Sequence, residues 1–260
     1  MGYVLAAVGP ELVEGALIFV AGTAIGSFVN VVILRTRAKT SVADGRSKCM
    51  GCQLSLSPRD LVPVVSFLAL RGKCRSCKVP ISIQYPLVEL SAGLLFVLAF
   101  LNDGLGLAFV RDAAFLSVLL VIFVYDLRYM EIPDRFTIPA MAFALVANLY
   151  LGFAWTSLAL GAVVAGGFFL AQYVLSKGAW IGGGDIRLGA LMGLMLGLPS
   201  TIAALFVAYV VGAIYAGWLI ATKKGSANTQ VPFGTFLAVA TVVAMFWGEG
   251  IVGWYLGLIQ

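Results

Sequence analysis

The sequence predicts an all-α polytopic membrane protein of about eight transmembrane helices, with a large polar loop between the first two. Of its 260 residues, 61% are hydrophobic and only 11% are charged, whereas a soluble domain carries roughly 25% charged residues. Long apolar runs recur along most of the chain, and one polar stretch interrupts them at 35–84. This composition excludes a soluble enzyme, a nucleic-acid-binding protein and a disordered chain.

Eight apolar runs define the expected spans, since about 20 apolar residues cross a bilayer core of roughly 30 Å. They cover residues 12–34, 86–101, 113–127, 136–154, 158–175, 186–198, 201–221 and 233–247. The sixth run is short, so we expect it to begin inside the membrane, surrounded by protein or by a wet cavity. The expected organisation is a first transmembrane segment at 1–34, a loop domain at 35–84 and a seven-helix domain at 85–260.

The distribution of Lys and Arg predicts the orientation. The 35–84 loop contains ten of the 17 basic residues and only two acids, Asp44 and Asp60. Eight spans place six more basic residues on the side of this loop and only Arg111 opposite; the six are Arg128, Arg135, Lys177, Arg187, Lys223 and Lys224. By the positive-inside rule the loop is cytoplasmic, where its charge also favours contact with anionic lipid headgroups.

Four cysteines in the loop form two C-x-x-C pairs, Cys49 with Cys52 and Cys74 with Cys77. Two such turns place four thiolates around a structural zinc ion, and a metal would stabilise a loop of about 50 residues that has little core of its own. A redox dithiol pair and thiols without any ligand role are the alternatives. The expected cytoplasmic location disfavours a stable disulfide.

The chain contains no histidine, which excludes Ser-His-Asp triads and His-ligated zinc catalysts. Three acids stand out in the apolar regions: Asp126 ends the third run, Asp185 opens the sixth after the glycines at 182–184, and Glu89 lies within the second. An ionisable residue at such depth is costly and therefore suggests function. The predicted topology places Asp126 and Asp185 at the same side and at similar depth, while Pro133 forces a turn after Asp126.

Two carboxylates in one dry site share a proton, so that one acts as a base and the other as an acid. Such a pair polarises a water and a peptide carbonyl together, which is the chemistry of aspartic proteolysis. Three alternatives remain open: each Asp only caps its helix or pairs with Arg128 or Arg187, the acids form the proton relay of a proton- or cation-coupled carrier, or the chain is a zinc-bearing scaffold without catalytic activity.

The short sixth run also carries Gly189, Gly193 and Gly197, which repeat every four residues. Such a stripe of small residues lets another helix approach closely. We therefore expect it to be a packing face.

The chain resembles the type IV prepilin peptidases, which are aspartic membrane proteases of the G-x-G-D class. The resemblance extends over nearly the whole length. It rests on residues 26–35, both C-x-x-C pairs, 61–63, 70–74, 80–82, 85–90, Asp126-Leu-Arg, Ile132-Pro-Asp134, Gly182-Gly-Gly184-Asp185-Ile-Arg and 232–238. At position 235, where many members of the family have proline, this chain has Thr235.

The resemblance implies a protease of the bacterial inner membrane whose active site faces the cytoplasm. Its substrates are prepilins and pseudopilins of pilus and type II secretion systems, which carry a short basic leader ahead of an apolar helix and are cut after Gly, usually before Phe. The catalytic carboxylates map to Asp126 and Asp185. Four residues are expected to support them: Asp134, Gly182, Gly184 and Glu89.

Many members of the family then N-methylate the new N-terminus with S-adenosylmethionine, an activity associated with the N-terminal cytoplasmic region. This chain retains that region, so methyl transfer is expected. No glycine-rich nucleotide loop on a strand–helix unit is visible, and no donor-binding residue is predicted.

Overall fold

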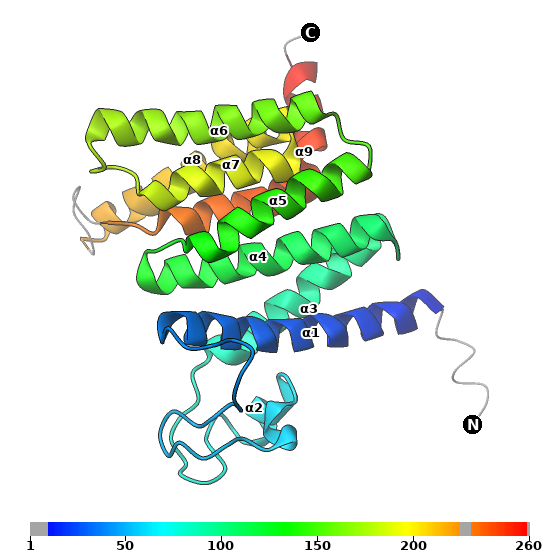
Figure 1. The fold of residues 1–260 in the computed structure, drawn as a ribbon, viewed down its shortest axis with the longest axis vertical. Coiled ribbons are helices and arrows are strands. Elements are labelled where there is room, and N and C mark those ends of the chain that lie inside the picture. The colour runs from blue at the N-terminus through cyan, green and yellow to red at the C-terminus, as the bar shows by residue number, and fades with distance from the viewer. Residues whose placement is uncertain (1–9, 224–229, 259–260) are drawn as a thin grey trace. The chain divides into compact units, whose positions relative to one another are not determined.

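The computed structural model describes residues 10–223 and 230–258, and this part of the chain is helical without any strand (Figure 1). Lys224, which the orientation argument used, and residues 1–9 of the first predicted segment lie outside the described residues. Two compact units make up the chain, Met1–Val121 and Ile122–Gln260, and their boundary falls within one helix.

Each of the eight predicted runs coincides with a helix. These helices are α1 (Pro10–Arg37), α3 (Gln84–Asp103), α4 (Leu107–Tyr129), α5 (Asp134–Tyr150), α6 (Trp155–Ser176), α7 (Gly183–Leu196), α8 (Leu198–Ala221) and α9 (Phe233–Gly257). The loop between α1 and α3 adds two short elements, η2 (Pro58–Leu61) and α2 (Val65–Ala69). The all-α fold is therefore confirmed for the described residues.

Six of these helices are long and apolar enough to cross a membrane, which makes the chain a multi-pass membrane protein. Within the described residues, α5 with 17 residues and α7 with 14 fall short of the length required. The predicted number of eight spans was therefore approximate. Large apolar side chains of α8 are exposed, including Phe206 at 69% and Ile214 at 68%, as expected for a surface in contact with lipid tails.

In the first unit, α1 packs directly on α3 because glycines bring the two backbones together. A Cβ on Gly22 would lie 2.8 Å from the Cα of Gly93, and one on Gly26 would lie 2.7 Å from the Cα of Glu89. The buried side chain of Asn30 donates to the carbonyl of Tyr85 at 3.2 Å. The end of α1 and the start of α3, from which the cysteine loop departs and to which it returns, are thus joined.

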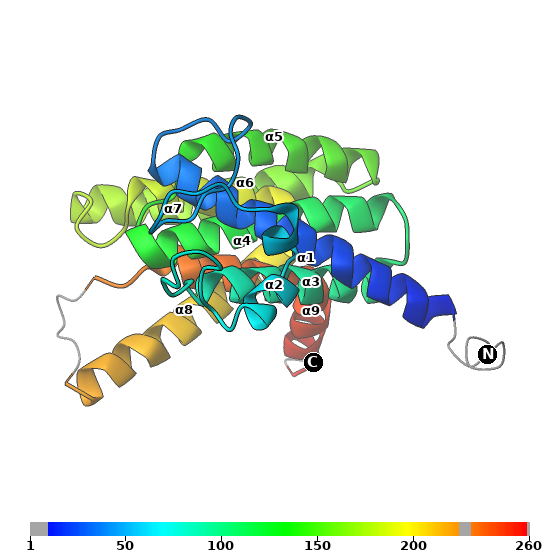
Figure 2. The ribbon, with the colours of Figure 1, turned by 90° about the horizontal axis from the view of Figure 1, so that it is seen from below.

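In the second unit, the short helix α7 lies at the centre and contacts α5, α6, α8 and α9. Its residues Leu188, Leu191 and Met192 have no exposed surface. A helix surrounded by protein in this way does not need to be long enough to span lipid. In Figure 2 the end of α8 stands away from the start of α9.

The glycine stripe of α7 is confirmed as a packing face at two of its three positions. A Cβ on Gly189 would lie 2.5 Å from the ring of Phe169 on α6, and one on Gly193 would overlap the backbone of Gly161. Gly197 has a different role, because it ends α7 with a φ of +72°, a conformation that favours glycine.

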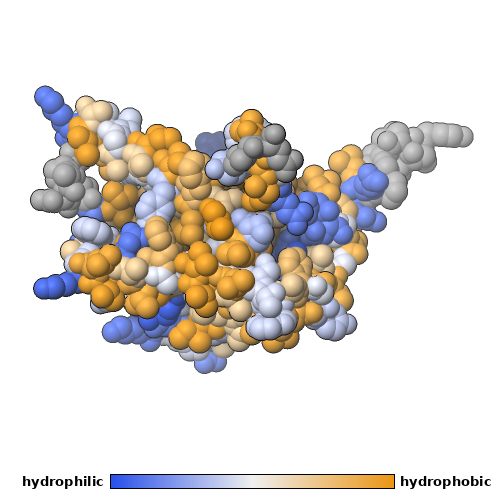
Figure 3. All heavy atoms as spheres, turned by 90° about the horizontal axis from the view of Figure 1, so that it is seen from above, coloured by the Kyte–Doolittle hydropathy of each residue, from blue (hydrophilic) through white to orange (hydrophobic). Residues whose placement is uncertain are grey.

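Hydrophobic residues cover much of the face of the molecule shown in Figure 3.

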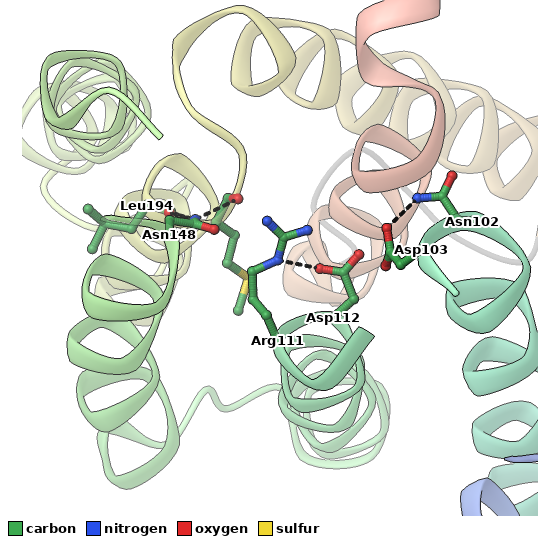
Figure 4. A network of polar contacts seen from close by, with 7 residues as sticks. Asn102, Asp103, Arg111, Asp112, Asn148 and Leu194 are labelled. Atoms are coloured by element: carbon green, nitrogen blue, oxygen red, sulfur yellow. Dashed lines mark hydrogen bonds and ion pairs between the residues drawn. The ribbon is translucent and has the colours of Figure 1, made fainter. Parts of the chain in front are cut away.

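The break between α7 and α8 is stabilised by side chains of neighbouring helices. The buried Asn148 of α5 donates to the carbonyls of Leu194 at 2.7 Å and Met195 at 3.1 Å (Figure 4). The hydroxyl of Ser157 accepts a hydrogen bond from the N–H of Leu198 at 3.0 Å. These bonds satisfy backbone groups that a helix end leaves without partners.

In the first unit, Figure 4 shows an ion pair at the start of α4. The Nε of Arg111 lies 2.6 Å from Oδ1 of Asp112, whose side chain is 3% exposed. Arg111 is the one basic residue that the predicted topology places opposite the cysteine loop, and Asp112 neutralises its charge.

Candidate active site

Asp126 and Asp185 line the same cavity of the second unit, which has a volume of about 530 Å³. Its wall consists of two residues near the end of α4, residues 130–133 between α4 and α5, Asp134 at the start of α5, and residues 182–185 and 187 at the start of α7. Both carboxylates are buried, with 4% and 8% of the residue exposed. Two acids from separate helices, at 126 and 185 in the sequence, therefore meet in one polar cavity.

The carboxylate of Asp126 lies against the N-terminus of α9. Its Oδ2 accepts a hydrogen bond of 2.8 Å from the backbone N–H of Thr235. A Cβ on Gly234 would lie only 2.9 Å from that same oxygen, so the absence of a side chain there allows the close approach. Free N–H groups and the positive end of the helix dipole favour a negative charge at this place.

Asp185 caps the start of its own helix. Its Oδ2 accepts a hydrogen bond of 3.1 Å from the N–H of Gly182, which fixes the side chain at the first turn of α7. Its Oδ1 is buried and has no hydrogen-bond partner among the residues that the structure describes. Because a buried acceptor without a partner is costly, this oxygen is the natural position for a water or a substrate group.

The side chain of Ile132 lies between the N-termini of α7 and α9, next to the two carboxylates. A Cβ on Gly184 would lie 2.8 Å from the Cβ of Ile132, and one on Gly234 would lie 2.7 Å from its Cδ1. The side chain of Ile132 therefore fits between α7 and α9 only because both positions are glycine. Gly182 and Gly183 are different, since no atom approaches closer than 3.4 Å to a Cβ added at either position.

Asp134 also lines the cavity and forms an ion pair with Arg187 of α7, with 2.6 Å between Oδ1 and Nε. The Nε–H is not directed at that oxygen, so the contact is an ion pair and not a hydrogen bond. The pair joins the first residue of α5 to the first turns of α7 in the wall of the cavity. Arg187 thus has Asp134 as its partner and leaves the carboxylate of Asp185 without a neutralising cation of its own helix.

The charges of the cavity wall are mostly negative. Its lining contains four carboxyl groups, those of Asp126, Glu131, Asp134 and Asp185, and a single guanidinium, that of Arg187. A wall of one predominant sign attracts groups of opposite charge. The cavity is therefore suited to a cationic ligand.

The four cysteines come together in the loop of the first unit. Their sulfur atoms all lie within 4.8 Å of one another, and the sulfurs of Cys49 and Cys77 are 3.7 Å apart. Tetrahedral zinc with Zn–S bonds of about 2.3 Å requires sulfurs roughly 3.8 Å apart. All four thiols are free of disulfides, so the donor set and its geometry fit a structural zinc ion.

Backbone groups prepare one of these thiols for metal binding. The N–H groups of Cys52 and Gly51 lower the pKa of Cys49 to about 6. The N–H of Val79 acts in the same direction on Cys77, but burial and the neighbouring thiols raise the pKa of Cys77 to about 11. Cys49 and Cys77 therefore do not ionise together by themselves, and a bound cation would supply the charge that stabilises both thiolates.

Glu89 lies in the first unit, apart from the residues that line the cavity. Its buried Oε2 accepts a hydrogen bond of 2.7 Å from the N–H of Val64, just before α2. Val64 has a φ of +61°, which is unfavourable for a β-branched residue. Glu89 thus fixes a strained turn of the cysteine loop on α3.

Sequence reasoning missed the groups that position the carboxylates: the N–H of Thr235, the glycine at 234 and the side chain of Ile132. A partial signal was available, because Pro232 ahead of an apolar run marks a helix start, and helix starts have free N–H groups. Nothing in the sequence indicated which carboxylate would lie against that start.

Comparisons with known proteins identify the family of the chain. Residues 20–102 match the family model described as the Bacterial Peptidase A24 N-terminal domain, and residues 113–217 match the Type IV leader peptidase family. No solved structure matches the chain.

Curated relatives match almost the whole chain. A Bacillus subtilis (strain 168) protein is 33% identical over 242 residues, which cover 93% of this chain and 97% of the relative. Proteins of Aeromonas hydrophila, with 32% identity and 93% of each chain covered, and of Legionella pneumophila, with 28% identity and 90% and 91% covered, are similar as well. All three bear the name prepilin leader peptidase/N-methyltransferase. The chain therefore belongs to the type IV leader peptidase family and is a peptidase.

Proposed function

We propose that this protein is a membrane-embedded aspartic endopeptidase that removes the basic leader from prepilins and pseudopilins, cutting after Gly at the cytoplasmic face of the bacterial inner membrane. The observation that carries the proposal is the meeting of Asp126 and Asp185, two buried carboxylates, in one cavity. Membership of a peptidase family disfavours the carrier and scaffold alternatives.

In the proposed reaction the two carboxyl groups share one proton. The ionised carboxylate takes a proton from a water while the protonated one donates to the oxygen of the scissile carbonyl, so that the water oxygen bonds to the carbonyl carbon. As the C–N bond breaks, the carboxyl group that took the proton of the water passes it to the leaving amine. The other carboxylate takes a hydroxyl proton from the tetrahedral intermediate, which becomes the new carboxyl terminus, so that the pair again holds one proton. The N-terminus of α9 beside Asp126 and the unpartnered Oδ1 of Asp185 support these roles.

The cytoplasmic orientation is supported by the charges at the same end of the second unit. The helices alternate in direction (Figure 1), so the end of α4 and the starts of α5 and α7 lie together with the ends of α6 and α8. Five basic residues occur in or next to these helix ends: Arg128, Arg135, Lys177, Arg187 and Lys223. The positive-inside rule assigns this end to the cytoplasm.

A basic leader is complementary to the cavity wall. Four carboxyl groups face a single guanidinium there, so Lys and Arg side chains of a leader would be attracted to the wall. Glu131 and Asp134 lie outside the proposed catalytic pair and are the groups we assign to leader binding.

We propose N-methylation with S-adenosylmethionine as the second activity, because relatives matched over most of the chain carry that name. We assign no residues to the methyl donor. Zinc would be held by Cys49, Cys52, Cys74 and Cys77. A site closed by four thiolates leaves no open position for a substrate, so the ion's role is to hold the loop together.

The test uses the purified full chain and a synthetic prepilin, with products identified by mass spectrometry with and without S-adenosylmethionine. Asp126→Asn and Asp185→Asn are each expected to lower the cleavage rate by about 100- to 10,000-fold, while Glu249→Gln, on the exposed part of α9, serves as the matched control. Normal cleavage by either folded Asn variant would overturn the proposed pair.

A further inference from the structure

A second cavity of the second unit lies beside Asp126 and is apolar. It has a volume of about 290 Å³ and is bounded by the end of α4, by α8 and by the start of α9. We call it the α8–α9 groove and define it by Leu127, Val207, Val211, Tyr215, Phe236 and Val239. Among the residues described between 10 and 223 and from 230 to 258, no charged one lines it, so it differs in character from the acidic cavity.

The groove and the acidic cavity meet at Asp126. Thr235 lines the groove, and its backbone N–H donates to Oδ2 of Asp126. Leu127, the next residue in the chain, also lines the groove. A polypeptide that crosses Asp126 therefore has an acidic wall on one side and an apolar wall on the other.

The groove is open toward the outside of the unit. Val211 on α8 is 43% exposed and Val239 on α9 is 46% exposed. In Figure 2 the end of α8 stands away from the start of α9. An apolar side chain on a membrane helix would reach the groove laterally, without passing through the acidic cavity.

We propose that the α8–α9 groove binds the first large apolar side chain on the carboxyl side of the scissile bond. This inference rests on the proposed function and adds the register of the substrate: cationic leader residues lie along the acidic cavity, the scissile bond lies at the two carboxylates, and the apolar segment begins in the groove. This direction follows from the contrast in polarity between two cavities whose walls are joined by the hydrogen bond from Thr235 to Asp126.

A lipid acyl chain has the same apolar chemistry as the proposed side chain, so the experiment must separate the two. It compares two synthetic prepilins that are identical except for the residue after the scissile bond, Phe in one and Ala in the other. The measured quantity is the ratio of kcat/KM for Phe over Ala. This ratio is independent of the fraction of correctly folded enzyme.

The variants narrow the groove from either side. Val211→Trp acts from α8 and Val239→Trp from α9, and the matched control is Val210→Trp, because Val210 is similarly exposed at 40% but does not line the groove. We expect the unmodified enzyme to prefer Phe by at least about tenfold, as differences of a few methylenes in an apolar pocket do. Both groove variants should bring the ratio close to one, and Val210→Trp should leave it unchanged.

Three results would overturn the groove assignment. The unmodified enzyme could show no preference for Phe over Ala, or Val210→Trp could lose the preference as fully as the groove variants. The groove variants could also keep the original ratio, which is the result expected if only lipid occupies the groove. Asp126→Asn separates this inference from the proposed function. If Asp126→Asn is inactive and the ratio is insensitive to Val211→Trp, only the groove assignment fails. If Asp126→Asn cleaves normally, the proposed function itself fails.

Discussion

The cysteine loop and the carboxylate cavity are built in opposite ways. The four thiols come from a single stretch of 29 residues, Cys49 to Cys77, and short backbone turns place them. The two carboxylates come from α4 and α7, and the hydrogen bond that holds Asp126 links residues 109 positions apart. The first site is local and the second depends on how three helices pack, so perturbations should affect them differently.

The largest expected effect follows from removing a ligand of the loop. Cys74 is the most buried of the four thiols, at 7% exposed, and Cys74→Ser should reduce bound zinc from one per chain to nearly none. Because structural zinc contributes about 10–16 kcal/mol in small metal-dependent domains, we expect cleavage by trypsin within residues 38–83 to accelerate at least tenfold. Metal analysis and mapping of the tryptic products check this.

A full complement of zinc in Cys74→Ser, or a loop equally resistant with and without metal, would contradict the structural role. Glu249→Gln, far along the chain in α9, serves as the control for handling losses. Cys74→Ser thus tests whether the structure of the cysteine loop depends on its four metal ligands.

The next effect concerns the packed site, where a single methyl group should matter. Gly184→Ala places a Cβ 2.8 Å from that of Ile132, and overpacking of this kind typically costs 1–3 kcal/mol. Since the displaced residue borders the carboxylate cavity, we expect cleavage to fall about 10- to 100-fold. Peptidase kinetics on the synthetic prepilin measure it.

Gly183→Ala is the matched control, because nothing lies within 4 Å of a Cβ at that position, and it should keep nearly full activity. Ile132→Ala combined with Gly184→Ala should recover part of the loss. If Gly183→Ala and Gly184→Ala behave alike, the spacing role of Ile132 is wrong.

The difference between the two sites also explains what the sequence could predict. The C-x-x-C spacing predicted the thiol cluster, because the geometry of a four-residue turn depends largely on the residues of the turn itself. The lengths of the apolar runs predicted the helices, because a helix needs about 20 apolar residues to cross lipid. The short α7 was also predicted, because a helix enclosed by protein does not need that length. In both cases the physical cause lies within a few neighbouring residues.

The arrangement around the carboxylates had no comparable local cause. That Arg187 pairs with Asp134, that Thr235 supplies an N–H to Asp126 and that Ile132 lies between two glycines all depend on contacts between distant helices. The distance between two residues in the sequence does not determine which helix N-terminus will contact which acidic residue in the folded protein. Such details follow only once the packing of α4, α7 and α9 is known.

A smaller effect tests one of those distant contacts. Thr235→Pro removes the N–H that Asp126 accepts, while the first turn of a helix tolerates proline. We expect the cleavage rate to fall about tenfold, near the lower limit for a hydrogen bond to a charged group, and the acidic limb of the rate–pH profile to move, because the donor favours the ionised carboxylate. Thr235→Ala keeps the N–H and is the control. Equal activity and identical profiles for the two variants would show that this bond does not position Asp126.

The smallest effect returns to the loop and to its surface charges. The hydroxyl of Ser57, and then the side chain of Arg75 at 2.8 Å, lower the pKa of Asp60 below its ordinary value of 3.8. A carboxyl group with a lowered pKa stabilises the fold above the pKa of the unfolded chain, and this contribution is lost as the pH falls through the folded-state value. Asp60→Asn should therefore destabilise the loop at pH 7, but by less than about 1 kcal/mol, because Arg75 is 60% exposed and such pairs are weak.

Proteolytic protection of the loop, measured for both proteins from pH 7 down to pH 3, gives the difference between them. That difference should be constant at neutral pH and should shrink only below about pH 4, the ordinary range of an aspartate. Because loss of zinc would unfold the loop of both proteins, they are compared only at pH values at which metal analysis shows one bound zinc per chain. If the difference already disappears between pH 7 and pH 5, the stabilising contact belongs to a group other than Asp60. The charges of the loop would then depend, like the carboxylates of the other unit, on partners that the local sequence does not identify.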